Sequence, residues 1–362
     1  MRMSHTGLRT WIVASVVSAC SSGPEARGDV RVDVVARGLV TPWSIAVAPD
    51  GRLFVTERRG RVRVIVRDSL VEQPWATLPA LDATAQRAET GLMGLTLDPN
   101  FAENPYVYVC YTERKDDGAV VNRVARLRER DGHGGDVEVL LDGIPANLYH
   151  DGCRLKVGPD SKLYITTGDA YLNAPAQDQS SLAGKVLRVN LDGSVPADNP
   201  TPGSPVWSLG HRNPQGLAWD PRTRLAVLVE HGSGAGDEIN ILERGANYGW
   251  PTEQGAVAKP AFRNPALVLH AAPAGAAFLP ALASADTSYL IVATLSGNRL
   301  IELAVHGRDV SIAKDPVLDG YGRFRDVVEG PEGSVYVSTS NRDGRGRPSR
   351  DDDRILRVWL RR

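Results

Sequence analysis

Residues 155–169 read LKVGPDSKLYITTGD, which is typical of two short strands joined by a tight turn. The turn residues favour a chain reversal, and the second strand is rich in β-branched and aromatic residues. The same pattern recurs at residues 45–57, 95–109, 217–230 and 327–339. Its prolines are spaced by 50, 60, 62 and 110 residues, at Pro49, Pro99, Pro159, Pro221 and Pro331. Self-similarity at this period indicates a repeat protein.

The largest gap in this spacing is two periods long. Inside it, residues 289–294 have the composition of the second strand of a unit that has lost its turn. Six units of four strands therefore fill residues 30–362. The spacing predicts one all-β domain, a six-bladed β-propeller of four-stranded antiparallel blades. A pair of β-sandwiches is the alternative, but that fold does not require a regular period.

The composition excludes several classes of function. The chain of 362 residues has 42 Lys+Arg and 43 Asp+Glu, a formal net charge of −1. This balance leaves no electrostatic footprint for nucleic acid and no polybasic surface for membranes. Beyond the N-terminus, no stretch of about 20 apolar residues predicts a membrane span.

The N-terminus has the pattern of an export signal. Positive charge at Arg2 and Arg9 precedes a short apolar core at residues 11–17, so residues 1–19 are predicted to be a signal peptide. Residues 17–20, Val-Ser-Ala-Cys, resemble the lipobox of bacterial lipoproteins. Lipidation at Cys20 would leave residues 20–29 as a tether and place the protein in the bacterial cell envelope. An ordinary secretory signal with an incidental cysteine is the alternative.

Two further cysteines, Cys110 and Cys153, form an even pair in an exported chain, so a disulfide is predicted. Cys110 ends the strand at residues 106–109 and Cys153 begins the first strand of the next unit. Neighbouring blades would bring their Cα atoms within about 4.4–6.8 Å of each other. Two buried free thiols are the alternative.

Function in a propeller is expected where loops converge on one face of the channel. His150 precedes the third unit and Asp169 follows its second strand, so both side chains are expected at the same rim. A carboxylate that orients an imidazole is a general-base arrangement. A surface histidine and an unrelated turn aspartate are the alternative.

Two arginine motifs suit anionic groups. Arg212 and Asn213 lie between strands in residues 209–217, where they are able to neutralise an oxyanion and donate a hydrogen bond. Arg323 and Arg325 are two positions apart in a predicted strand, so both side chains are expected on the same face of that strand. A polar surface loop and a solvated edge are the respective alternatives.

Residues 230–240 form a glycine-rich loop with acidic side chains. Exposed carbonyls and carboxylates together suit calcium, although a flexible loop is the alternative. No cysteine and histidine spacing predicts zinc, and no phosphate-binding or dinucleotide-binding motif follows a strand.

With these motifs the chain resembles the soluble quinoprotein glucose and aldose sugar dehydrogenases, six-bladed propellers that use pyrroloquinoline quinone (PQQ) and calcium. The resemblance runs from residue 38 to residue 358. Its most specific stretches are residues 91–94, 184–193, 210–218 and 247–251.

The resemblance implies a role for each matching residue. His150 corresponds to the catalytic base and Asp169 to the carboxylate that orients it. Arg212 and Asn213 correspond to groups that face the quinone carbonyls. Glu89 takes the place of a residue near the histidine and the substrate, which is Gln in the best-known member.

The resemblance also implies two calcium sites. Gly232 and Ser233 correspond to residues whose carbonyls bind the calcium linked to the cofactor. Glu238 and the carbonyl of Tyr248 correspond to part of a second, structural site. Ser233 replaces a frequent proline, a change that preserves the backbone carbonyl.

Arg323 and Arg325 correspond to groups that bind the carboxylates of PQQ. Ser296 departs from the family, because well-studied members have there a lysine that pairs with PQQ. The loss of one charge-assisted contact of roughly 1.5–3 kcal/mol weakens binding about 10- to 150-fold if nothing replaces it. Arg299 is near in sequence, but strand alternation does not decide whether it faces the channel.

The resemblance implies PQQ-dependent oxidation of an aldose sugar at its anomeric carbon to the lactone, with electrons passed to an external acceptor. A propeller that has lost PQQ and binds carbohydrate or protein is the first alternative. A calcium-dependent lactonase is the second.

Overall fold

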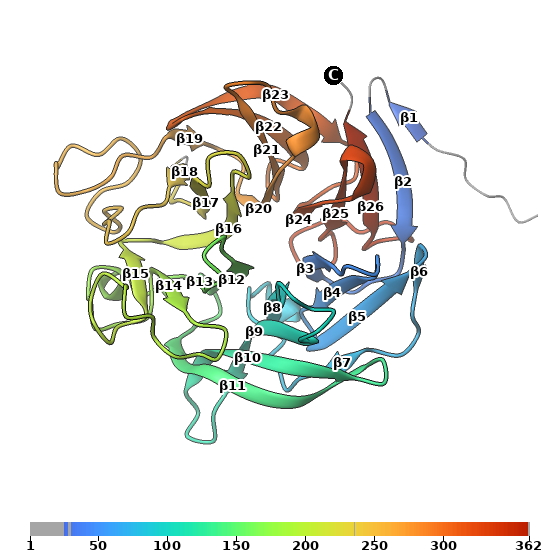
Figure 1. Ribbon diagram of the computed structural model, residues 1–362, viewed down its shortest axis with the longest axis horizontal. Helices are drawn as coiled ribbons and strands as arrows, with labels where there is room; N and C mark the ends of the chain where they lie inside the picture. Colours follow the sequence, from blue (N-terminus) through green and yellow to red (C-terminus); the bar gives the residue numbers. More distant parts are fainter. Residues whose placement is uncertain (1–24, 28–29, 235, 361–362) are drawn as a thin grey trace, which may run out of the picture.

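The computed structural model describes residues 25–27, 30–234 and 236–360. Six antiparallel sheets stand around a central axis like the blades of a propeller (Figure 1). The innermost strands are β3 (Pro42–Val47), β8 (Leu92–Leu97), β12 (Gly152–Val157), β16 (Asn213–Trp219), β20 (Pro273–Phe278) and β24 (Phe324–Glu329). Each packs against the innermost strands of both neighbouring blades, so together they line the channel.

The outer strands complete the blades in chain order. The second strands are β4 (Leu53–Glu57), β9 (Tyr106–Arg114), β13 (Leu163–Thr167), β17 (Ala226–His231), β21 (Ser288–Thr294) and β25 (Ser334–Thr339). The third strands are β5 (Arg61–Val66), β10 (Val120–Arg130), β14 (Lys185–Val189), β18 (Asp237–Ile241), β22 (Arg299–His306) and β26 (Ile355–Leu360). The outermost strands are β6 (Ser69–Leu70) with β7 (Ala76–Thr77), β11 (His133–Pro145), β15 (Val206–Leu209), β19 (Leu267–Leu269), β23 (Asp309–Asp319) and β2 (Val30–Ala36). Four 3₁₀ turns lie in loops, at Thr84–Gln86, Ala174–Ala176, Pro280–Leu282 and Pro331–Gly333.

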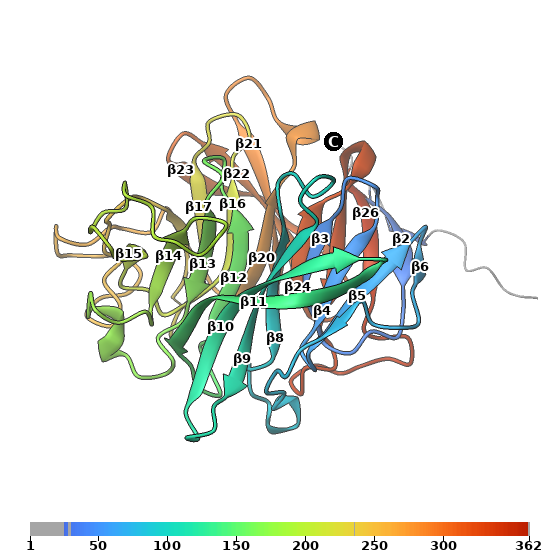
Figure 2. The ribbon, with the colours of Figure 1, turned by 60° about the horizontal axis from the view of Figure 1, so that its bottom comes forward.

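The predicted six-bladed propeller is confirmed, and the β-sandwich alternative is wrong. The unit without a turn is present as predicted, because β21 contains residues 289–294 and is the second strand of its blade. The ring closes because an early strand belongs to the last blade. Strand β2 pairs with β26 and is the fourth strand of that blade (Figure 2). This closure joins the first described residues to the last without a covalent link.

Each innermost strand has an irregularity of register near its first residues. The shifts fall between Pro42 and Ile45 in β3 and between Gly152 and Leu155 in β12, with equivalents in β8, β16, β20 and β24. A β-bulge bends its strand and changes the direction of side chains, and such bulges are frequent next to active sites. The six bulges therefore shape one end of the channel.

Apolar side chains pack between adjacent blades. One cluster joins the last two blades through Phe324 and Ile291, and another joins the first two through Phe54 and Val109. Phe54 makes edge-on contacts with Trp75 and Phe101, a favoured geometry for aromatic pairs. This packing holds the blades in fixed positions and leaves the polar residues to the channel.

The predicted signal peptide (residues 1–19) and Cys20 lie outside the described residues. Within the predicted tether, β1 (Glu25–Arg27) pairs with β2, so this part of residues 20–29 is a short strand at the edge of the last blade. No helix found in the described residues has the length and apolar character needed to cross a membrane.

Candidate functional site

His150 and Asp169 meet at one end of the channel, as the sequence predicted. His150 immediately precedes the β12 hairpin and Asp169 follows β13. The His150 Nδ1 atom lies 2.8 Å from Asp169 Oδ1. The same carboxylate accepts hydrogen bonds from Trp250 Nε1 and from the backbone of Tyr171, both at 2.8 Å.

These contacts determine the tautomer of His150. An ionised carboxylate only accepts hydrogen bonds, so Nδ1 carries the proton and Nε2 has the lone pair. No hydrogen bond from a described residue reaches Nε2. The arrangement is therefore that of a general base with a free accepting nitrogen.

The backbone around this pair is unusual. His150, Ala170 and Tyr171 have φ values of 61°, 53° and 59°, in the left-handed region that non-glycine residues seldom adopt. At Gly168 a Cβ atom would lie 1.8 Å from the carbonyl oxygen of His150, so only glycine fits there. Strain of this kind concentrates at functional sites.

Glu89 connects the histidine to the other side of the channel. It accepts hydrogen bonds from the His150 backbone at 3.1 Å, from Asn213 Nδ2 at 3.2 Å and from Arg345 Nη1 at 2.8 Å. Burial alone would raise the pKa of Glu89, but the charge and hydrogen bond of Arg345, together with the nearby rings of His231 and His150, hold that pKa well below its usual range. Glu89 is therefore a carboxylate at neutral pH.

Asn213 lies at the first residue of β16, and both ends of its amide are occupied. Its oxygen accepts a hydrogen bond from the Gly152 backbone at 3.1 Å, and its nitrogen donates to Glu89. In this structure Asn213 therefore joins the His150 hairpin to Glu89.

Arg212 lies beside the His150 pair. Its carbonyl accepts a hydrogen bond from the Asp169 backbone at 2.8 Å, so the two predicted site residues are adjacent. The guanidinium stacks over Trp250 at 5.3 Å and donates to the carbonyls of Gly232 and His231. The Arg212 Nε atom is buried without a hydrogen-bond partner.

Arg323 and Arg325 come from β24 and the residue before it, and they share one carboxylate. Arg323 Nε lies 2.8 Å from Asp343 Oδ2, whereas Arg325 Nη2 is 3.9 Å from it. Burial lowers the pKa of Arg325 to about 9 despite the attraction of Asp343. Arg325 is therefore a buried cation that the protein neutralises only in part, and its Nε has no partner.

Three buried nitrogen atoms without hydrogen-bond partners indicate whether the residues of this site suit PQQ. Arg212 Nε, His231 Nε2 and Arg325 Nε are all buried without a hydrogen bond. Burial lowers the pKa of His231 to about 4, so its ring is neutral. Buried polar atoms without partners cost stability unless a ligand or water satisfies them. The set fits a polar, anionic ligand such as PQQ.

The loop for which calcium is predicted, at residues 230–240, presents carbonyl groups that already have partners. The carbonyl of Gly232 accepts from Arg212 Nη1 at 2.7 Å, and that of Ser233 accepts from Gln254 Nε2 at 2.7 Å. Among the residues that the structure describes, no cluster of three or more His, Cys, Asp or Glu side chains would hold a metal. A calcium ion here would therefore depend on backbone oxygens.

Glu238 lies in a more favourable setting for a cation. Burial, and then the charge of Glu230 on the adjacent strand, raise the pKa of Glu238 to about 7. Asn240 Nδ2 donates to Glu238, and the buried Asn240 Oδ1 has no partner. No described residue donates to the carbonyl of Tyr248. Carboxylate, amide and carbonyl oxygens are the ligand types that a hard cation prefers.

In the fifth blade, Arg299 does not take the place of the lysine that the family resemblance implies at the position of Ser296. Ser296 is exposed, and its carbonyl accepts a hydrogen bond from Asn298. Arg299 forms a bidentate ion pair with Asp315 on β23, the outermost strand of its blade. Arg299 therefore binds away from the channel.

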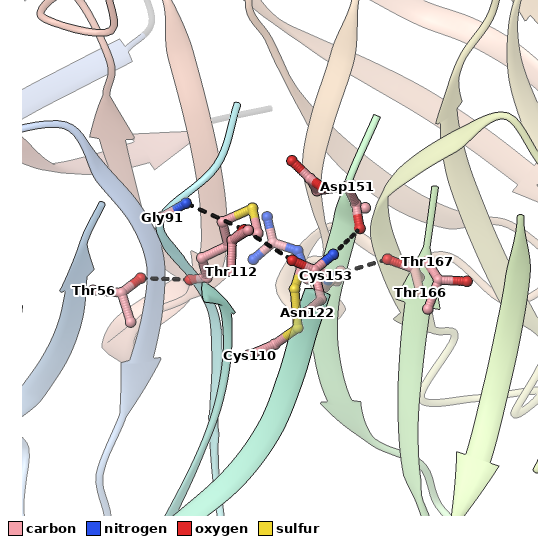
Figure 3. The surroundings of a disulfide bond; sticks show 12 residues. Thr56, Gly91, Cys110, Thr112, Asn122, Asp151, Cys153, Thr166 and Thr167 are labelled. Atoms are coloured by element: carbon pink, nitrogen blue, oxygen red, sulfur yellow. Dashed lines mark hydrogen bonds between the residues drawn. A yellow bond between two sulfur atoms is a disulfide. The ribbon is translucent and has the colours of Figure 1, made fainter. Parts of the chain in front are cut away.

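The predicted disulfide is present. Cys110 in β9 and Cys153 in β12 are bonded, with Cα atoms 5.7 Å apart, and the bond joins neighbouring blades (Figure 3). Asn122 donates to the backbone carbonyl of Asp151 beside it. Asp151 is buried, its Oδ2 has no partner, and burial raises its pKa to about 7.

Several residues at the site were not identified from sequence. Trp250 holds Asp169, Arg345 holds Glu89, Asp343 pairs with Arg323, and His231 contributes a buried neutral ring. Trp250 and His231 lie within two recognisable motifs, at residues 247–251 and 230–240. Arg345 and Asp343 lie in a glycine- and arginine-rich stretch with no recognisable motif.

The fold and the site define a six-bladed propeller with a cluster of polar and cationic side chains at one end of its channel. The chain matches the glucose/sorbosone dehydrogenase family over residues 39–357 and belongs to that family. Membership in this dehydrogenase family identifies the protein as an enzyme.

Relatives and solved structures agree with this assignment. Aldose sugar dehydrogenase YliI of Escherichia coli is 30% identical, over 87% of this chain and 91% of its own length. Quinoprotein glucose dehydrogenase B of Acinetobacter calcoaceticus is 34% identical, over 61% of this chain and 52% of its own length. The PQQ-bound aldose sugar dehydrogenase of Streptomyces coelicolor superposes with a TM-score of 0.82 at 34% identity, covering 93% of this chain and 99% of that one.

Proposed function

We propose that the protein oxidises an aldose sugar at its anomeric carbon to the lactone, with PQQ as cofactor and calcium bound beside it, and passes the electrons to an external acceptor. The observation that carries this proposal is the His150–Asp169 pair, in which one nitrogen of His150 is free to accept a proton and the backbone of Asp169 is hydrogen-bonded to that of Arg212. The PQQ-bound relative supports the choice of cofactor.

His150 Nε2 takes the proton from the anomeric hydroxyl of the sugar. Asp169 keeps the proton of His150 on Nδ1 and stabilises the imidazolium that forms. Glu89, fixed by Arg345, holds the backbone of His150 in place. PQQ, when bound, supplies the quinone that accepts hydride.

The residues that would hold PQQ are Arg212, Asn213, Arg323, Arg325 and Glu89. Arg325 has the clearest need for an anion, since its charge is buried and only partly neutralised. Calcium would bind the carbonyls of Gly232 and Ser233, with a second ion at Glu238 and the carbonyl of Tyr248.

Reconstitution tests the proposal. The purified chain is mixed with PQQ and calcium, and reduction of a dye by several aldoses is followed together with the absorbance of the cofactor. We expect a perturbed cofactor spectrum and sugar-dependent dye reduction. PQQ binding without turnover on any aldose, or no PQQ binding, contradicts the proposal. Chelation of calcium should lower the melting temperature, and an unchanged melting temperature contradicts both calcium sites.

Ser296 favours a second candidate, a propeller that binds carbohydrate or protein without PQQ. The structure offers no cation in place of the missing lysine on that blade, because Arg299 is bound to Asp315. Under this alternative, calorimetry detects sugar binding by the chain alone, and PQQ changes nothing. A lactone-hydrolysis assay run in parallel tests the calcium-dependent lactonase.

We also propose that the protein is exported to the bacterial cell envelope and anchored by a lipid on Cys20. Residues 17–20 support this proposal. Incorporation of labelled palmitate, absent in Cys20→Ala, is the expected result. Release of unlabelled wild-type protein from the cell indicates an ordinary secretory signal.

A further inference from the structure

A cavity lies outside the group of residues assigned to the candidate active site. It has a volume of about 500 Å³ and lies between the segment at residues 38–40, the loop at residues 341–352, and the side chains of Arg59 and Thr84. Three arginines line it, Arg59, Arg342 and Arg350. The proposed oxidation of the sugar uses none of these three cations.

The loop at residues 342–354 has three of its four acidic side chains inside and most of its arginines outside. Asp343, Asp352 and Asp353 are buried, and other residues of the protein donate hydrogen bonds to each of them. Arg347 and Arg350 are exposed and make no hydrogen bond or ion pair with any described residue. The loop therefore presents mainly positive charge to solvent.

Neighbouring acids neutralise this charge only in part. Arg59 lies 3.5 Å from Asp82, and the exposed Asp351 is paired with Arg37 at 3.2 Å. The carboxylate of Asp352 is bound by Arg354 at 3.0 Å. No such pairing reaches Arg350, which lines the cavity.

Two hydrogen bonds link the wall of this cavity to the candidate catalytic histidine. Gly344 and Gly346 line the cavity, whereas Arg345 between them donates to Glu89. Glu89 in turn accepts a hydrogen bond from the His150 backbone. The wall is closely packed, since a Cβ at Gly344 would lie 2.8 Å from the carbonyl oxygen of Thr84. A ligand in the cavity would thus contact a wall that is bonded, through Arg345 and Glu89, to the candidate catalytic histidine.

We propose that this arginine-lined cavity binds the external electron acceptor and that the acceptor is a small polyanion. The inference rests on the proposed dehydrogenase function. Conversion of one aldose to its lactone releases two electrons and two protons. Two hexacyanoferrate(III) ions take one electron each and become hexacyanoferrate(II), and the protons pass to water. Positive potential at the cavity raises the local concentration and the association rate of an anion.

Acceptors of opposite charge test the proposal in the reconstituted holoenzyme. In Arg350→Glu the kcat/KM for hexacyanoferrate(III) should fall about tenfold, while that for a cationic phenazinium acceptor should not fall. Added salt should reduce the wild-type value for the anion, because ions screen the attraction. Equal losses with both acceptors overturn the proposal.

Arg67→Glu is the matched control. Arg67 is also exposed and without a partner, but it lies in the turn after β5, whereas Arg59 precedes that strand. The two variants change the net charge equally. The control should leave kcat/KM unchanged for both acceptors. A loss as large as that caused by Arg350→Glu would show that only the net charge of the protein matters, and it would overturn the assignment of the cavity.

Binding is measured separately on the chain without cofactor, by calorimetry with hexacyanocobaltate(III), a trianion that is not reduced in this assay. Arg350→Glu should weaken its binding about tenfold, and Arg67→Glu should not. Binding that Arg350→Glu does not change indicates an adventitious ion only and overturns the site. A holoenzyme that reduces no acceptor at all overturns the dehydrogenase function itself, whatever the calorimetry shows.

Discussion

Two histidine–carboxylate pairs occupy equivalent places in neighbouring blades. His150 precedes β12 and lies 2.8 Å from Asp169, and His211 precedes β16 and lies 2.9 Å from Glu230. In each pair the histidine and the carboxylate are separated by 19 residues. Sequence spacing and Nδ1 geometry therefore do not distinguish one pair from the other.

The second ring nitrogen makes the difference. His211 Nε2 lies 2.8 Å from Ser208 Oγ, the ring stacks on Tyr248 at 4.7 Å, and the residue is 0% exposed. His150 Nε2 has no hydrogen-bond partner among the described residues, and His150 is 7% exposed. A histidine–carboxylate pair is structural when both nitrogens are bound, and it is able to accept a proton from a substrate only when one nitrogen is free.

The largest effect is expected from the chemistry of the first pair. His150→Gln should lower kcat by roughly 10²–10⁴-fold, because the substituted side chain cannot accept the proton. PQQ binding, followed by its absorbance, should persist. Near-normal turnover in this variant would show that His150 is not the catalytic base, although one of its nitrogens is free.

The segments that carry the two histidines are anchored differently, and only that of His150 has a disulfide. Replacing Cys110 and Cys153 by serine opens a loop of 43 residues, which should lower the free energy of unfolding by about 4 kcal/mol on the chain-entropy estimate. Urea unfolding of this variant is compared with that of the oxidised wild type, and the reduced wild type is the control. Equal stability of the variant and the oxidised wild type would contradict the prediction.

The second pair should matter for stability. His211→Ala leaves Glu230 and Ser208 buried without this partner and should lower the free energy of unfolding by roughly 2–3 kcal/mol. His150→Gln, measured by the same urea titration, is the control and should cost less. A larger loss for His150→Gln than for His211→Ala would remove the distinction between the two pairs.

The smallest effect concerns Asp151, the residue after His150. Its folded pKa of about 7 exceeds its unfolded value of about 3.9, so the native state keeps a proton that the unfolded state has lost. Stability is therefore lost as pH rises from about 4 to about 7, and the loss persists above pH 7.

Asp151→Asn should remove this loss. Near pH 4 it should be as stable as the wild type, and at pH 8 it should be more stable by roughly 1–3 kcal/mol, since no charge is then buried. Urea unfolding at both pH values measures the difference. A difference that does not change with pH would show that Asp151 does not titrate in this range.

The sequence by itself determined the fold, because the repeat of turns and strands is local information. Strand pairing inside each blade follows from neighbours in the chain, and the weak fifth unit was still recognisable by its second strand. The sequence also allowed the prediction of His150, Asp169, Arg212 and the disulfide, because they lie near the ends of strands whose positions follow from the repeat period.

The tertiary structure alone decided which groups meet across the ring. Arg345 reaches Glu89 across 256 residues, and Arg154 reaches Asp326 across 172. It also decided that β2 closes the last blade, that Arg299 pairs with Asp315, and that His211 is enclosed while His150 is free. Periodicity encodes strands and turns, but a side chain's partners depend on how six blades close around one axis, and that closure brings together residues that no local pattern relates.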